Sequence, residues 1–294
     1  MSASRWLVRP PNLDDVAPLR AIATAVSQPT QPIQALYTQD ANGRFWTITQ
    51  QNQPIGYATL LPLPGLPHLF ELTGGIAPQF QRQGAGSFLW QAVQGDVIGT
   101  AVQQITHTVN NLDTLAAHFL RHHQFELAHE EWTMQLDNLP SRTLPPLTPL
   151  GTLKQLGRGT AVHTLPKLYD RCFAHTPWYQ PYTPNEITTS WEPPDELWVL
   201  QADNQAIGFA WLHFPGPKTA VIEPIGIVRE KQGMGYGRFL LITILQTLQQ
   251  RGIQTVSLGV WANNETAVHL YQSVGFQRSG SSYSLTYTFP SAAI

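Results

Sequence analysis

The sequence has little cysteine and little charge, and both scarcities limit what the protein can be. A single cysteine, Cys172, excludes a disulfide within the chain and fits a reducing, intracellular setting. Charged residues make up only 12% and the formal net charge is −2, which gives no general reason to expect a nucleic-acid or membrane partner. No apolar run approaches the length of a membrane span, and the first residues lack the apolar core of a signal peptide. We therefore expect a cytoplasmic protein, a monomer or a homodimer.

The chain repeats itself at an offset of 151 or 152 residues. Apolar residues form 42% of its 294 residues, enough for two globular domains. The repeated segments are "NQPIGYATL" at 52–60 and "NQAIGFAWL" at 204–212, "QRQGAG" at 81–86 and "QGMGYG" at 232–237, and "AAHFLRHHQF" at 116–125 and "AVHLYQSVGF" at 267–276. Three matches in the same order predict a duplicated domain.

A segment rich in proline separates the two copies. "DNLPSRTLPPLTPLGTL" at 137–153 has the composition of a linker. We expect a first domain over 1–138, a linker over 139–150 and a second domain over 151–294.

The second copy predicts a mixed α/β sheet. The expected elements are a hairpin that turns at Asp203-Asn204, a strand over 219–228, a helix from Gly235 to Gly252, a strand over 255–260, a short helix from Asn264 to Gly275, and a last strand over 282–289. Antiparallel strands followed by a strand–helix–strand unit indicate the α/β class with a mixed, α+β-like sheet.

The glycines of "QGMGYG" lie between a strand and a helix, where free backbone N–H groups lie at the positive end of the helix dipole. Such a turn favours an anion, most often a phosphate. A Walker loop would end in Gly-Lys-Ser/Thr, but Gly237 is followed by Arg238 and Phe239. A dinucleotide fingerprint would need a third glycine where Leu240 stands.

The pattern Gln-x-x-Gly-x-Gly occurs at 81–86 and again at 232–237. It resembles the acyl-CoA loop of the GNAT N-acyltransferase superfamily. "NETAVHLYQSVGF" at 264–276 resembles the late helix of that family, and "WLVRPPNLDDVAPL" at 6–19 resembles its first strand and helix. The resemblance implies two tandem GNAT-type domains with acetyl-CoA, or another acyl-CoA, as cosubstrate.

In this family the amides of the loop hold the CoA pyrophosphate. The residues that the resemblance assigns to CoA in the second half are Ile227, Val228, Gln232, Gly233, Met234, Gly235, Tyr236, Gly237, Arg238 and Asn264. Those that it assigns in the first half are Ile76, Ala77, Gln81, Arg82, Gln83, Gly84, Ala85 and Gly86.

Acyl transfer to an amine needs a base for the amine, a donor for the carbonyl oxygen and an acid for the thiolate. The resemblance implies that Tyr271 is the acid, although it could also be an aromatic residue that packs a short helix. Glu223 shares a strand face with Val221, Ile225 and Ile227, so it is either partnered or has a raised pKa. It is our candidate for the base, the alternative being a solvated carboxylate at a strand end.

The first half keeps the loop but lacks the acid, because Leu120 stands opposite Tyr271 in the repeat. Glu71 lies near the position of Glu223, and we expect His118 and His123 to be surface residues. Tandem members of the family such as mycothiol synthase are similar in having one active and one degenerate half. The first half is therefore expected to bind CoA without catalysis or only to shape the second half.

The acceptor side of the second half resembles the corresponding loop of mycothiol synthase-like enzymes. "CFAHTPWYQPYTPNEI" at 172–187 gathers His175, Trp178, Tyr179 and Tyr182, and could equally be a rigid aromatic surface turn. The histidines lack the spacing of a metal site, so no metal is expected.

These patterns predict an N-acetyltransferase that moves an acetyl or other acyl group from acetyl-CoA to a primary amine of a small molecule or peptide. One alternative is a non-catalytic acyl-CoA-binding or sensing protein. Another is a nucleotide-binding module that uses the glycine loop for ATP.

Overall fold

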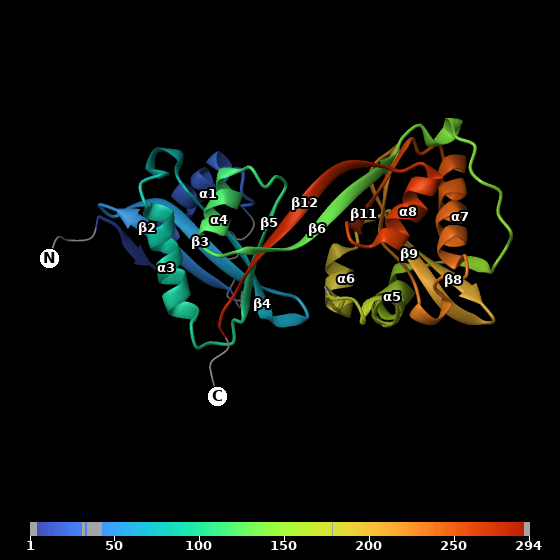
Figure 1. Cartoon of the computed structure of the whole chain (residues 1–294), viewed down its shortest axis with the longest axis horizontal. Helices are drawn as coiled ribbons and strands as arrows, with labels where there is room; N and C mark the ends of the chain where they lie inside the picture. The colour runs from blue at the N-terminus through green and yellow to red at the C-terminus, as the bar shows by residue number, and fades with distance from the viewer. Residues whose placement is uncertain (1–4, 31–32, 34–42, 178, 291–294) are drawn as a thin grey trace. The chain divides into compact units, whose positions relative to one another are not determined.

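The chain folds into two compact units, and neither is continuous in sequence. The computed structural model describes residues 5–30, 33, 43–177 and 179–290 (Figure 1). Unit 1 comprises Met1–Thr108, Thr114–Leu127 and Ser284–Ile294. Unit 2 comprises Val109–Asp113 and Ala128–Tyr283.

Unit 1 is a sheet with strand order β1-β2-β3-β4-β5-β12, in which β4 and β5 are parallel and the pairs from β1 to β4 are antiparallel. Its elements before the last strand are β1 (Leu7–Arg9), α1 (Val16–Ala25), β2 (Arg44–Gln50), β3 (Gln53–Leu63), β4 (Leu66–Ile76), α3 (Ala85–Val97), β5 (Gln104–Val109) and α4 (Leu115–His122).

Unit 2 has the strand order β12-β6-β11-β10-β9-β8-β7, with β10 and β11 parallel. Its elements are β6 (Glu126–Leu136), β7 (Thr152–Leu156), α5 (Arg158–Phe173), α6 (Pro184–Ser190), β8 (Glu196–Ala202), β9 (Gln205–Gly216), β10 (Thr219–Ile227), α7 (Tyr236–Gln250), β11 (Thr255–Trp261), α8 (Glu265–Val274) and β12 (Gln277–Thr288). The mixed sheets confirm the predicted fold class. No helix in the described ranges is long and apolar enough to cross a membrane.

Three local signals in the second copy are confirmed, whereas the last strand begins at Gln277, earlier than the predicted 282. Asp203 and Asn204 have φ values of 51° and 60°, as a tight hairpin turn requires. The side chain of Asn264 accepts a hydrogen bond from the N–H of Ala267 at 3.3 Å and so caps α8. Gly252, with φ of 76°, follows the end of α7.

Strands β6 and β12 each belong to one unit at one end and to the other unit at the other end. Unit 1 takes β6 up to Leu127 and β12 from Ser284 onward. In unit 1 the end of β12 is followed by Phe289, whose N–H donates to the carbonyl of Gln103 at 2.9 Å. The predicted domain boundaries at 138 and 151 are based on the sequence repeat. The compact units have different boundaries, because each of these two strands is divided between the units.

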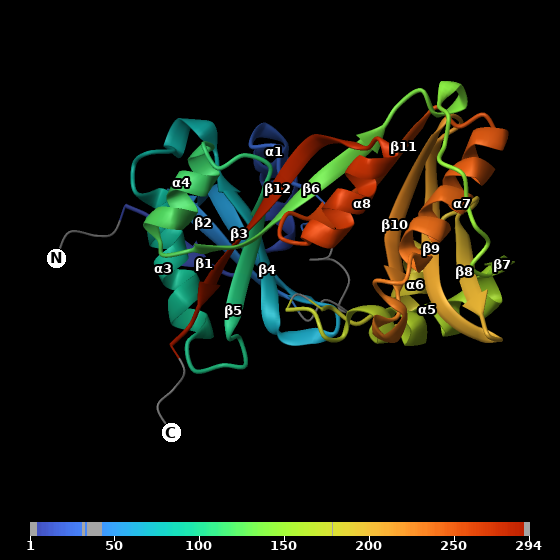
Figure 2. The same ribbon diagram turned by 45° about the vertical axis from the view of Figure 1, so that its right-hand side comes forward.

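The sheet of unit 2 is covered on both faces. Phe209 and Trp211 of β9 are buried, and Phe209 meets the ring of Phe173 on α5 while Trp211 stacks on Trp191. Because side chains alternate along a strand, the buried Ala210 points to the opposite face. Helix α7 also contacts β9, and its apolar side chains supply that second layer (Figure 2).

Because the end of β12 belongs to unit 1, a mutation in this part of the strand is expected to destabilise unit 1. Leu285 is fully buried, so Leu285→Ala is expected to lower the free energy of unfolding by about 2–5 kcal/mol through lost burial and a cavity. The loss should be seen as faster hydrogen exchange in β2–β5 of unit 1, more than 170 residues away in the sequence. Leu127→Ala, at a site that is 48% exposed, is the matched control and should change little. Equal effects of the two substitutions would contradict the assignment.

Candidate active site

The glycine loop of each unit is fixed by a glutamine that folds back on the preceding strand. Gln81 Nε2 donates to the carbonyl of Ile76 at 2.8 Å, and Gln232 Nε2 donates to the carbonyl of Ile227 at 2.9 Å. The two hydrogen bonds are equivalent, since each spans five residues across a short turn of 3-10 helix. Both copies therefore hold the loop in the same way.

The two loops also enter their helices with the same backbone conformation. Gly84 and Gly235 precede α3 and α7 with φ values of 89° and 83°, a left-handed conformation in which an L side chain is strained. The first N–H groups of each helix have no partner within the helix. They point to the position where an anion is favoured by the helix dipole.

The residues predicted for CoA lie at matching places in the two units, although their binding of CoA stays a prediction. In unit 2, Ile227 ends β10, Val228 follows it, Gln232, Gly233, Met234 and Gly235 form the loop, Tyr236, Gly237 and Arg238 form the first turn of α7, and Asn264 caps α8. In unit 1, Ile76 ends β4, Ala77 follows it, Gln81, Arg82, Gln83 and Gly84 form the loop, and Ala85 and Gly86 begin α3. The guanidinium of Arg238 donates to Ser273 Oγ at 2.9 Å and so joins α7 to α8.

Tyr271 and Glu223 come together in unit 2. Tyr271 lies on α8 and is 6% exposed. Burial, with the nearby Glu223 charge, raises the pKa of its phenol, which keeps the hydroxyl protonated. Glu223 lies at an irregularity of β10, where the register to β9 shifts between Ile222 and Ile225. Such bulges redirect a side chain and are common beside active sites.

The carboxyl group of Glu223 has a raised pKa. The residue is exposed, but a carboxyl group can be reached by water and still be surrounded by protein atoms, and this desolvation is the main cause of the shift. His213 acts in the opposite direction and lowers the pKa. The balance leaves Glu223 on β10 with a carboxyl group that holds its proton more strongly than an ordinary glutamate.

His213 connects the Glu223 backbone to Asp195. Its Nε2 lies 2.9 Å from the carbonyl oxygen of Glu223, and its Nδ1 lies 2.8 Å from Oδ2 of Asp195, whose side chain is only 4% exposed. The two ring nitrogens of His213 thus lie against oxygen atoms on two different segments of the chain, which fixes the orientation of the ring. The ring thereby positions the backbone at Glu223.

A second carboxylate, which the sequence analysis did not identify, lies beside Glu223. Glu131 of β6 and Glu223 of β10 approach Gly259 of β11 from its two sides. A Cβ atom built on Gly259 would lie 2.5 Å from Oε1 of Glu131 and 3.1 Å from Oε1 of Glu223. Burial, with the Glu223 charge, raises the pKa of Glu131 to about 7. Gly259 was the one sequence signal for this site, because a glycine inside a strand often marks a place where another group approaches the backbone closely.

The aromatic residues of the predicted acceptor segment gather near α5. Tyr169 contacts the rings of both Tyr179 and Tyr182, and the Tyr179 hydroxyl donates to Asp170. Burial, then the charge of Glu223, raises the pKa of Tyr182. His175 is exposed.

Two further residues complete the account of this segment. Trp178 lies outside the described residues. Cys172 is buried against the core, as expected of a packed thiol.

Unit 1 has neither of the two candidate catalytic groups. Leu120, at the position of Tyr271 in the repeat, is buried. Glu71 pairs with Leu61 and Thr106, as Val221 does with His213 and Ser257 in unit 2. Glu71 therefore corresponds to Val221, because the irregularity in β10 adds one residue. The place of Glu223 is taken by Thr73, which is buried and hydrogen-bonded to Thr59.

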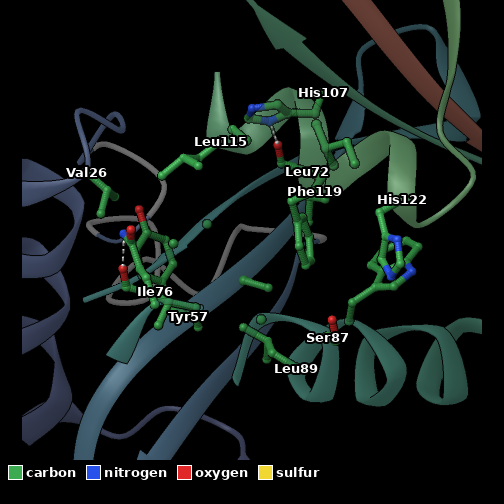
Figure 3. Close-up of a pocket in the computed structure, with 18 of the residues that line it drawn as sticks. Val26, Tyr57, Leu72, Ile76, Ser87, Leu89, His107, Leu115, Phe119 and His122 are labelled. Atoms are coloured by element: carbon green, nitrogen blue, oxygen red, sulfur yellow. Dashed lines mark hydrogen bonds between the residues drawn. The ribbon is translucent and has the colours of Figure 1, made fainter. Parts of the chain in front are cut away.

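Unit 1 nevertheless holds a pocket of about 630 Å³ beside its glycine loop (Figure 3). Tyr57, which is 2% exposed, lines it, and its hydroxyl has no hydrogen-bond partner in the described structure. His118 is exposed, as expected, but His123 is half-buried and its Nε2 lies 2.9 Å from Ser87 Oγ. In the described part of the chain, no three His, Cys, Asp or Glu side chains are placed to hold a metal ion.

Comparison with known families explains the two matching loops. The model of the acetyltransferase (GNAT) family matches residues 13–125 and 162–276, which is more than half of the chain. The chain belongs to this family. Its GNAT domains occur in tandem, as the repeat predicts.

Relatives and solved structures agree with the tandem arrangement. The chain is 26% identical over 217 residues to a mycothiol acetyltransferase of Paenarthrobacter aurescens, covering 69% of this chain and 65% of the relative. It is 27% identical over 168 residues to one of Cellulomonas flavigena, covering 52% and 48%. The chain thus spans about half to two thirds of the length of these curated relatives.

Among solved structures, a tandem GNAT protein from the clavulanic acid biosynthesis pathway has a TM-score of 0.62 at 16% identity, covering 98% of this chain and 100% of that one. A GCN5-related N-acetyltransferase from Sphaerobacter thermophilus has a TM-score of 0.65 at 19% identity, covering 99% and 98%. At these identities the likeness shows the shared GNAT fold.

The raised pKa of Glu131 predicts how the stability of this GNAT protein depends on pH. Between the usual value of 4.5 and about 7, the native state holds a proton that the unfolded chain has lost, so stability falls as pH rises through this window. Glu131→Gln removes that loss and should be more stable than the wild type at pH 8 but not at pH 4.5. Chemical denaturation at the two pH values measures the difference. A gap that stays constant with pH, or that is reproduced by Glu130→Gln, would contradict the assignment.

Proposed function

We propose that the protein is an acetyl-CoA-dependent N-acetyltransferase that acts on the primary amine of a small molecule or peptide, and that unit 2 performs the reaction. The proposal is supported chiefly by one contrast. Unit 2 combines a glycine loop with Glu223 and Tyr271, whereas unit 1 has an equivalent loop with Thr73 and Leu120 in their places.

The residues of unit 2 suit each step of the transfer. A glutamate with a raised pKa accepts the proton of the entering ammonium, whose ordinary pKa is about 10.4 for a lysine-type amine. The neutral nitrogen then forms a bond to the thioester carbonyl carbon. In this family a backbone N–H of the strand before the loop stabilises the oxygen that gains charge.

The reaction ends when the carbon–sulfur bond breaks. The departing thiolate needs a proton, and the Tyr271 hydroxyl is kept protonated by its burial and by the charge of Glu223. The nitrogen of the adduct gives up its second proton, which restores the Tyr271 hydroxyl, and the amide and free CoA are the products. The loop at 232–237 holds the CoA by its backbone amides, with Arg238 and Asn264 at the adjoining helix starts.

Acyl-CoA binding without catalysis is a second candidate, and it concerns unit 1. The pocket of about 630 Å³ beside its loop favours a bound ligand there. Unit 1 would then bind an acyl-CoA while unit 2 performs the chemistry. Alternatively, the whole protein would bind acyl-CoA without catalysing any reaction and would serve as a sensor of it.

Replacement of Tyr271 tests the proposed acid. Tyr271→Phe is expected to lower kcat on the order of 100-fold, because a general acid contributes at least that factor, while CoA affinity changes little. Free thiol released from acetyl-CoA in the presence of an amine panel measures the rate. Tyr283→Phe removes a hydroxyl from a half-buried tyrosine outside the site and should keep the wild-type rate.

Full activity of Tyr271→Phe would show that another group donates the proton. Release of no thiol with any amine, together with stabilisation by acetyl-CoA against heat, would favour the sensing protein. Stabilisation by ATP but not by CoA would instead favour a nucleotide-binding module.

A further inference from the structure

The two carboxylates beside Gly259 form a site that the proposed mechanism does not require. Glu223 alone can serve as the base. Glu131 reaches the same place from β6, where it is paired opposite Trp261, while Gly259 is paired opposite Thr133. Oε1 of Glu131 lies 2.5 Å, and Oε1 of Glu223 lies 3.1 Å, from the position that a Cβ atom would take on Gly259. The two carboxylate oxygens are therefore close to each other.

The approach depends on the absence of a side chain at Gly259. The parallel pairing of β10 and β11 is recorded up to Val221 and Ser257, and two residues farther along bring Glu223 beside Gly259. A methyl group there would lie 2.5 Å from the Glu131 carboxylate, which is too close for any real contact. Glycine thus allows both acidic side chains to occupy one point on the sheet.

No lysine or arginine forms an ion pair with these two carboxylates in the described structure, although the charge of His213 lowers the pKa of Glu223. Neither Glu131 nor Glu223 takes part in any of the ion pairs found there. The adjacent Glu130 behaves differently, because its Oε1 lies 2.7 Å from the Arg278 guanidinium and 2.8 Å from the indole nitrogen of Trp132.

The other groups around the pair are phenols, histidines and one more acid. The pKa values of Tyr169, Tyr182 and Tyr271 are all raised in part by the Glu223 charge, so these phenols stay neutral. On β6, burial lowers the pKa of His129 and favours its neutral form. The His213 ring is held between the Glu223 carbonyl and Asp195. When both carboxyl groups are ionised, they therefore present negative charge that no lysine or arginine of the described ion pairs balances.

We propose that Glu131 and Glu223 together bind the ammonium group of the acceptor, and that the pair selects amines that carry no carboxylate close to the amino group. An ammonium has three N–H donors and can be shared by two carboxylates. A carboxylate on the acceptor would face two like charges in a partly desolvated place, which is unfavourable. Amino alcohols, amino sugars and diamines fit the site, whereas free amino acids do not. This inference rests on the proposed function.

The proton then moves within the same arrangement. One ammonium N–H gives its proton to a carboxylate oxygen of the pair, and the nitrogen keeps the electron pair with which it attacks the thioester. Glu131 is thus a binding residue for the acceptor, contributed by a strand that precedes the linker in the sequence.

A matched pair of amines tests the selection directly. 3-Amino-1-propanol and β-alanine differ only in a terminal CH2OH or carboxylate. In the presence of saturating CoA, we expect wild-type protein to bind the amino alcohol at least 10-fold more tightly than β-alanine, as measured by ligand-observed NMR titration. Glu131→Gln should reduce this ratio several-fold without changing the Kd of CoA, and Glu130→Gln should leave the ratio unchanged.

A second variant separates the position of Glu131 from its charge. Gly259→Ala keeps every charge but displaces the Glu131 carboxylate, so it should reduce the ratio as Glu131→Gln does. Equal binding of the two amines by the wild type, no binding of either, or an unchanged ratio in Glu131→Gln would each overturn the inference. Turnover is measured separately, so selective binding without thiol release would refute the proposed function and leave this site established.

Discussion

The antiparallel pairing of β6 with β11 is the contact on which the site of unit 2 depends. It runs from Val256 opposite Leu136 to Trp261 opposite Glu131. On its other side β11 pairs with β10 only over a short stretch, so without β6 it would present unpaired backbone groups along most of its length. The same pairing that satisfies this edge brings Glu131 to Gly259.

Local features of the fold could be predicted from the sequence because local residues determine them. Gly235 requires a left-handed conformation, Asn264 caps a helix with its own side chain, and Asp203-Asn204 turns a hairpin, all within a few residues. The partners of β6 and β12 could not be predicted, since either strand pattern is compatible with several neighbours. Glu131 was missed for this reason, as it is 128 residues from Gly259 in the sequence.

The comparison of Glu71 with Glu223 shows a different limit. Counting residues back from the two loops makes these glutamates nearly equivalent, yet the strand register pairs Glu71 as it pairs Val221. One added residue in β10 reverses which side chains face which way beyond it. Counting from the loops therefore aligns the wrong glutamate, and the strand register identifies Thr73 as the counterpart in unit 1 of the proposed base on β10.

Features that depend on the backbone occur in both copies, whereas features that depend on a single side chain occur in only one. The proposed anion site at the loop depends on the backbone, and the Gln81 and Gln232 hydrogen bonds together with the left-handed glycines give the loop the same conformation in both units. The proposed acid and base depend on single side chains, which a substitution removes without disturbing the fold, as the buried Leu120 does in unit 1. In the proposed site of unit 2, the Glu223 charge adds to burial in raising the pKa of Glu131, so the two carboxylates repel each other once both are ionised. An entering ammonium relieves that repulsion, and its deprotonation restores the preference of the pair for one proton. The repulsion therefore favours both the binding of a cationic amine and its conversion to the neutral nucleophile.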